Sequence, residues 1–253
     1  MTEERPQSEA SEPSASETIG AALGAAARRA GLDPSDSAST QKVVWSAMGG
    51  WRGILESVLP TLAFVIVFTL RPEPLLLSLG VSVGLAAVFT IVRLVQKSPP
   101  SAAIGGLLAA AVAAALALLT GKGADNFVPG FLTNTLYGAA LLVSAFVGWS
   151  LIGLAVGFLM GEGTAWRQHR RKRRAFFWLA ISWAGLFIAR LAVQVPLYFR
   201  SVDDPSITAM LGTAKLVMGL PLFAPMIAVT WLVVRALYPR ASDADTADTA
   251  DNA

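Results

Sequence analysis

Arg190 is the residue whose chemistry most needs explaining. It lies in the middle of a long apolar segment, and Gln194 follows four residues later, so a helix would place both on one face. An arginine deep in a membrane is costly unless it faces a helix bundle, a wet cavity or a partner. We interpret Arg190 as part of a structural polar network, with the handling of an anion as the alternative. Its candidate carboxylate partners are Glu56, Asp125, Asp203 and Asp204, and the sequence assigns none of them.

A second charged pair lies near the start of the first apolar segment. Arg52 and Glu56 are four residues apart, which allows an ion pair on one helix face. A carboxylate that enters the apolar layer is costly unless it is paired or faces water. The structural interpretation is an interfacial ion pair that seats the helix. The functional interpretation is a proton or substrate site.

Lys215 lies in the last apolar segment, close to residues that interrupt helices. Gly212 and Gly219 share a helix face with it, and Pro221 follows. This pattern predicts either a broken helix that exposes backbone at a binding site or an ordinary kink. Because the segment is long, we expect its start near Lys215 to lie at the membrane interface on the outer side.

Two polar residues of the fourth apolar segment also share a helix face. Asn134 and Tyr137 are three residues apart. Side chains of this kind often make hydrogen bonds between helices in membranes. We expect such bonds here rather than a ligand site.

The densest charge in the chain lies in the run RQHRRKRR. We interpret this run as a topogenic signal that keeps its loop in the cytoplasm. The alternative is binding of anionic lipid headgroups or an acidic partner. No aromatic residues interleave the run, so we expect no nucleic-acid binding. Its basic members are Arg167, Arg170, Arg171, Lys172, Arg173 and Arg174.

The sequence carries none of the common catalytic or metal-binding patterns. It has a single histidine, His169, and no cysteine. It also lacks a P-loop, a dinucleotide-binding glycine fingerprint, an HExxH motif and a nucleophile elbow. We therefore expect no catalytic residues, no metal and no cofactor, and we expect the protein not to be an enzyme.

The elements that must position these residues are membrane-spanning helices. Hydrophobic residues make up 54% of the chain, charged residues only 15%, and the mean hydropathy is +0.57. Soluble domains are about a quarter charged. The apolar runs predict an all-α transmembrane bundle of about six helices, because a span needs about 20 apolar residues. The expected spans are 53–70, 75–95, 101–120, 132–152, 175–199 and 212–237.

The fourth apolar segment, residues 131–161, is too long for one straight crossing. We expect a crossing near 132–152, after which the chain bends along or beyond the cytoplasmic surface. Gly153, Gly157 and Gly161 would share a face there. We expect this stripe to pack within the chain, with helix dimerisation as the alternative.

Most lysines and arginines near span ends fall on one side, which places both termini in the cytoplasm of a bacterial inner membrane. The lipid bilayer, and anionic lipid headgroups in particular, are therefore the expected partners. Residues 1–40 and 240–253 are rich in small, polar and acidic residues, so we expect disordered tails around a helical domain at 41–239.

Three motifs of the sequence begin at Gly49, at Arg190 and at Gly219, and read GGWRGILESVLPTLAF, RLAVQVPLY and GLPL. Together they resemble an actinobacterial membrane family known as domain of unknown function 3159. The likeness covers about residues 42–238, and the family's activity is not established.

A more distant likeness is to the intracellular septation protein A family, small inner-membrane proteins linked to envelope synthesis and division. The shared features are Pro60, Arg93, the Asn134–Tyr137 pair, Trp178 and Trp183. This resemblance implies a non-enzymatic role in envelope assembly or division, with membrane proteins of that machinery as partners.

Two other functions remain open from the residues alone. The first is a small transporter or channel for an anion or a lipid headgroup, with Arg190, Gln194, Glu56 and Lys215 lining its path. It requires these side chains to converge on one polar cavity. The second, an enzyme acting on lipid, has little support because Glu56 is the only carboxylate in the expected spans.

Overall fold

The computed structural model describes residue 45, residues 49–96 and residues 100–238, and all of these that adopt regular structure are helical. The long helices are α3 (Gly50–Leu70), α4 (Leu75–Val95), α5 (Pro100–Thr120), α6 (Val128–Phe146), α8 (Arg170–Asp203) and α10 (Leu220–Leu237). Shorter elements connect them: η1 (Gly123–Phe127), α7 (Leu151–Leu159), η2 (Ala165–Gln168) and α9 (Ile207–Val217). The expected tails, 1–40 and 240–253, lie outside the described residues.

The described helices have the length and composition of membrane spans. Five segments are long and apolar enough to cross: Gly50–Leu70, Leu75–Val95, Gly123–Phe146, Arg170–Asp203 and Ile207–Leu237. Residues Ile104–Thr120 of α5 form a shorter apolar helix. Large apolar side chains point outward, and Leu119 and Leu70 are 86% and 75% exposed. Such a surface is stable against lipid rather than water, so the chain is a multi-pass membrane protein.

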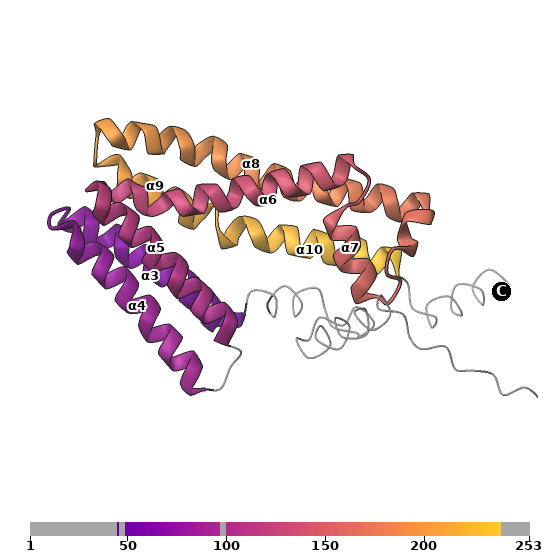
Figure 1. Ribbon diagram of the computed structural model, residues 1–253, viewed down its shortest axis with the longest axis horizontal. Coiled ribbons are helices and arrows are strands. Elements are labelled where there is room, and N and C mark those ends of the chain that lie inside the picture. Colours follow the sequence, from indigo (N-terminus) through magenta and orange to yellow (C-terminus); the bar gives the residue numbers. More distant parts are fainter. Residues whose placement is uncertain (1–44, 46–48, 97–99, 239–253) are drawn as a thin grey trace, which may run out of the picture.

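Two groups of helices make up the bundle, as Figure 1 shows. The first arm consists of α3, α4 and α5, which pack on one another in order. The second arm consists of α6 and α8, with α7 and α10 against α8. Helix α9 contacts both α3 and α8 and therefore links the arms. The arms meet near α9 and diverge away from it (Figure 1).

A buried aromatic cluster, which we call the joint, holds the arms together where they meet. Its members include Phe64 and Phe68 of α3, Phe127 of η1 and Leu211 of α9. The rings of Phe64 and Phe127 lie edge to face, with centroids 5.6 Å apart. Such contacts add to the burial of large apolar side chains, so the joint is the best-packed part of this end.

A second core lies at the opposite end of α8. Trp166 is 1% exposed and meets Phe176 edge to face. A Cβ atom on Gly153 or Gly157 would lie 2.7 or 2.6 Å from the Trp166 ring. The expectation that these glycines pack within the chain is confirmed for both. Gly161, in contrast, has no atom within 4 Å of such a Cβ and stands in a turn.

The fourth span differs from its expected bounds. The prediction of 132–152 was wrong at both ends, because the helical segment runs from Gly123 to Phe146 and α7 starts afresh at Leu151. Gly148 adopts a left-handed φ of 78°, which a helix cannot contain. The Ser150 hydroxyl then accepts a hydrogen bond from the Gly153 N–H and caps α7. The break expected within 131–161 therefore lies at residues 147–150.

The last two spans also differ from expectation. Helix α8 has 34 residues, roughly 50 Å, against the expected 175–199, so its ends extend beyond a hydrocarbon core of about 30 Å. The expected span 212–237 is divided into α9 and α10, and Gly219 lies between them with a non-helical backbone. The break predicted from Gly219 and Pro221 is confirmed.

Candidate functional site

A cavity of about 780 Å³ lies between the two arms. Every long helix of the bundle contributes to its lining, together with η1 and α9. Its wall on α3 extends from Gly49 to Thr61, a length of about 18 Å at 1.5 Å per residue. Phe127 of the joint lies at the other end of this wall, where the arms meet. The cavity is therefore closed by the joint at one end and extends to the start of α3, where the arms diverge.

Arg190 of α8 lines this cavity and has no acidic partner within the described chain. Its guanidinium lies 5.4 Å from the ring centroid of Phe223 on α10. Its Nε atom is buried and has no hydrogen-bond acceptor. The four carboxylates considered from the sequence do not pair with it. The structural network expected around Arg190 is therefore missing from the described residues.

Gln194 lies one turn further along α8 and faces the same cavity. Its side chain is buried, with the residue 2% exposed, and its amide nitrogen has no acceptor. A buried donor without a partner destabilises a fold by about 1–3 kcal/mol. Arg190 and Gln194 thus present polar groups that other described residues leave unsatisfied.

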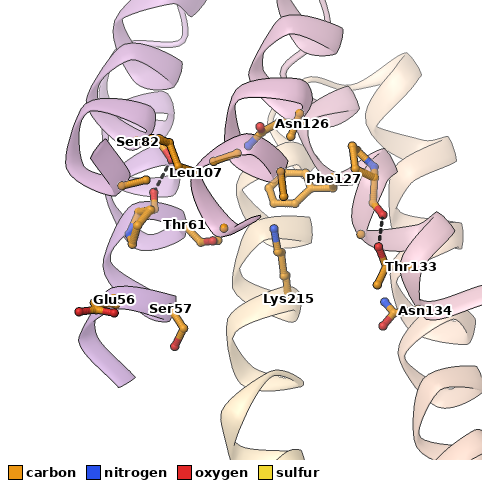
Figure 2. Close-up of a pocket in the computed structure, with 18 of the residues that line it drawn as sticks. Glu56, Ser57, Thr61, Ser82, Leu107, Asn126, Phe127, Thr133, Asn134 and Lys215 are labelled. Carbon is orange, nitrogen blue, oxygen red and sulfur yellow. Dashed lines mark hydrogen bonds between the residues drawn. The ribbon is translucent and has the colours of Figure 1, made fainter. Parts of the chain in front are cut away.

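Lys215 of α9 projects into the cavity between the arms. The expectation that the start of this span lies at the outer interface stays a prediction. Its ammonium lies 5.1 Å from the ring centroid of Phe127. Figure 2 shows the side chain extending along the cavity toward that ring. No carboxylate of the described chain pairs with it, and it lies close enough to Arg190 for the two charges to repel. The break after α9 lets this short helix enter the space between the arms.

Among the described residues that line the cavity, Glu56 is the only acidic one. Arg52 donates to it through Nε at 2.7 Å, which confirms the ion pair predicted within α3. Arg93 of α4 forms a second ion pair with it at 2.9 Å. Arg52 donates further to Gln96 at the end of α4. The carboxylate therefore bridges two helices near the open end of the cavity.

Arg93 is a cavity residue that the site analysis of the sequence did not include. It lies at the end of α4, and Glu56 lies near the start of α3. The tight connection between α3 and α4 makes these helices antiparallel neighbours, so those two ends must meet. This pairing of helix ends was the signal in the sequence that could have identified Arg93.

Asn134 and Tyr137 of α6 line the cavity as well. Neither has a hydrogen-bond partner among the described residues, so the expected hydrogen bonds between helices are not formed. Figure 2 shows Asn134 beside Thr133, whose hydroxyl donates to the Pro129 carbonyl at 2.8 Å. Both side chains can therefore hydrogen-bond to water or a ligand in the cavity.

The charges facing the cavity do not balance. Among the described residues, Arg93, Arg190 and Lys215 contribute positive charge, and Glu56 contributes negative charge. Arg93 is paired with Glu56, so Arg190 and Lys215 remain uncompensated. Unpaired charges in a low-dielectric interior are strongly unfavourable. An anion in the cavity would remove this penalty.

The basic cluster of residues 167–174 lies outside the cavity, at the start of α8. Lys172 pairs with Glu162, and Arg167 lies 3.8 Å from the ring centroid of Trp149. Partial burial acts to raise the pKa of Glu162, but hydrogen bonds from Lys172 and Tyr238 outweigh it and hold that pKa below its usual value. The exposed remainder of the cluster faces the surroundings of the bundle: Arg170, Arg171, Arg173 and Arg174.

Within the part of the chain that the structure describes, no group of three or more histidine, cysteine or acidic residues could hold a metal ion. The cationic groups at the cavity are the guanidiniums of Arg93 and Arg190 and the ammonium of Lys215, which donate hydrogen bonds and bind anions rather than cations.

Comparison with known proteins gives a family but no activity. A family model described as "Protein of unknown function (DUF3159)" matches residues 48–241. No curated protein and no solved structure shows a significant match.

Proposed function

We propose that this chain, which belongs to the DUF3159 family, is a membrane carrier that binds an oxyanion in the cavity between its two arms. The observation that carries the proposal is the presence of two uncompensated cations, Arg190 and Lys215, in one cavity. An arginine within a membrane-spanning helix is energetically unfavourable, and such residues commonly mark a substrate or ion path.

The hydrogen-bonding groups at these cations favour an oxyanion. A guanidinium carries five N–H donors and an ammonium three, and neither accepts. The buried Gln194 amide nitrogen adds a further donor without a partner. Carboxylate, phosphate and sulfate oxygens satisfy several such donors at once, and hydrogen bonds between ionised groups are about twice as strong as neutral ones.

The shape of the cavity favours a carrier over an open channel. The joint closes one end with packed aromatic side chains, whereas the other end reaches the start of α3. A carrier exposes its site to one side of the membrane at a time. We assign the open end to the cytoplasm, because most of the basic residues near span ends lie at this end of α3, α4 and α8.

Glu56 fits this function as a neutralising group at the mouth. It holds Arg93 while the cavity is empty of substrate, and an entering anion can take its place. Binding by this route makes and breaks only non-covalent contacts, so the proposal is non-enzymatic. The role in envelope assembly that the resemblance implies stays a prediction, because the geometry of the cavity does not test it.

Anion-dependent stabilisation of the purified protein tests the proposal. A ligand that binds only the folded state raises the apparent melting temperature with concentration. At constant ionic strength, we expect at least one of sodium phosphate, sulfate and acetate to stabilise the wild type more than sodium chloride does. The double variant Arg190→Gln/Lys215→Met should lose that response.

The matched control carries Arg200→Gln and Lys122→Met, which remove exposed cations outside the cavity. This control should respond as the wild type does. Equal responses of wild type and the double cavity variant to every anion would refute the proposal.

A further inference from the structure

We infer that the ligand of this cavity is a dianionic phosphate monoester with an apolar organic body. The inference rests on the proposed function and specifies the class of anion. It follows from three properties of the site: the number of uncompensated charges, the kind of donors that surround them and the composition of the opposite wall.

The two uncompensated positive charges at the site favour a ligand that carries two negative charges. Arg190 and Lys215 are both uncompensated and lie close enough to repel each other. A monoanion between them would leave one positive charge unpaired in a low-dielectric interior. A phosphate monoester carries nearly two charges at neutral pH and three strong acceptor oxygens. A diester carries one charge and fewer free oxygens.

The unpaired donors lie on two helices that pack against each other, α8 and α9, and face one cavity. Arg190 and Gln194 lie one turn apart on α8, and Lys215 enters from α9. The Arg190 Nε and the Gln194 amide nitrogen both lack acceptors. A tetrahedral head with three free oxygens accepts from a guanidinium and an ammonium together, which concentrates the ligand charge at this wall.

On the opposite wall, α5 is apolar and leaves room for an organic body. Helix α5 contributes Leu107, Ala110 and Ala113, and α4 contributes Ala86 and Phe89 beside the polar Ser82 and Arg93. The cavity of about 780 Å³ has the size of a site for a whole organic ligand and greatly exceeds the roughly 30 Å³ that one water molecule occupies. Inorganic phosphate would leave this wall in contact with water. A monoester with an apolar body would cover it.

The head can belong to a soluble phosphate monoester or to a lipid such as phosphatidic acid. These sources share the same recognition chemistry, so two arms of the experiment separate them. The first arm measures binding of phenyl phosphate, diphenyl phosphate, inorganic phosphate and succinate to the full chain in detergent by calorimetry at pH 7. The second compares thermal stability in nanodiscs that contain phosphatidic acid or phosphatidylglycerol at equal mole fraction.

We expect phenyl phosphate, or phosphatidic acid in the nanodiscs, to be preferred over the corresponding diester by about tenfold or more, as expected for one additional charge-assisted contact. Phenyl phosphate should also bind more tightly than inorganic phosphate and succinate. The preference should shrink below pH 6, where the monoester loses its second charge.

Variants distinguish charge pairing from general damage to the fold. Arg190→Gln and Lys215→Met should each abolish the preference for the monoester, whereas Arg190→Lys, which keeps the charge, and the control Arg200→Gln should retain it. Size-exclusion profiles confirm that each variant is folded.

Three outcomes decide the inference. Binding of the diester or of succinate that is equal to or tighter than that of the monoester would overturn the inference. A preference for the monoester that persists in both cavity variants would also overturn it. In both cases the proposed carrier function would survive. Failure of every anion to bind would overturn the inference and the proposed function together.

Discussion

At the residue scale, the decisive question is whether Arg190 and Lys215 stabilise the fold or serve a ligand. A structural network would give each cation a partner, and the loss of either would leave that partner unsatisfied. The structure instead leaves both without acidic partners among the described residues. Glu56 shows the contrast, because it is held by Arg52 and Arg93 at 2.7 and 2.9 Å. The two unpaired cations therefore destabilise the ligand-free fold, which indicates that they serve a ligand.

We expect Lys215→Met to raise the stability of the ligand-free protein. Methionine keeps much of the side-chain volume and removes a charge that Arg190 repels. A gain of about 1 kcal/mol would raise the apparent melting temperature by about 2–4 °C in a protein of this size. Thermal unfolding in detergent at one scan rate, without oxyanions, measures the change. The exposed control Lys122→Met should shift it far less, and a drop of several degrees for Lys215→Met would restore the structural interpretation.

At the scale of the elements, helix α9 decides the geometry of the site because it carries Lys215 between the arms. Its close approach to α3 depends on Gly212, where a Cβ atom would lie 2.2 Å from the Val65 Cγ2 atom. Valine in a helix has one strongly preferred rotamer, so Val65 cannot turn away cheaply. The α9–α3 contact therefore requires glycine at this position.

Gly212→Ala should destabilise the protein by about 1–3 kcal/mol, as expected for overpacking a close contact. The double variant Gly212→Ala/Val65→Ala should recover part of the loss, because the colliding methyl group is gone. In the matched control Gly105→Ala on α5, nothing lies within 4 Å of the added Cβ, so stability should be unchanged or slightly higher. Thermal unfolding of the four proteins checks this, and a Gly212→Ala variant as stable as wild type would argue against close α9–α3 packing.

The elements also show which parts of the fold the sequence can predict. The length of the apolar runs located the helices, and of the two alternatives given for Gly219 with Pro221 the structure shows the break before α10. The bounds of α6 were missed because apolar composition continues past Gly148, where the chain turns. Those of α8 were missed for the opposite reason, because the helix continues past its apolar residues into the charged residues at both ends. Hydropathy measures how apolar a segment is, but it gives little information on the residue at which the hydrogen bonds of the helix end.

At the scale of the whole molecule, the sequence suggested the residues of the site but not their arrangement. The hypothesis of an anion path required Glu56, Arg190, Gln194 and Lys215 to meet in one cavity, and the structure places all four along its wall. Arg93 was missed as a cavity residue, although the tight connection between α3 and α4 places it beside Glu56. The place of Lys215 in the cavity depends instead on how α9 inserts between the arms, which apolar composition does not indicate.

The central claim is that this cavity holds water and an anion and opens toward the cytoplasm. The chain has no cysteine, so a single introduced cysteine reports its own surroundings. Thr61→Cys lies in the cavity wall, and Thr213→Cys is an exposed position on α9 outside it (Figure 2 shows Thr61).

The measurement is the rate at which a membrane-impermeant, anionic methanethiosulfonate modifies each variant in inside-out and right-side-out vesicles. The account predicts fast modification of Thr61→Cys only in inside-out vesicles, slowed by phenyl phosphate, and little modification of Thr213→Cys. A Thr61→Cys variant that is as unreactive as Thr213→Cys in both vesicle types would contradict it.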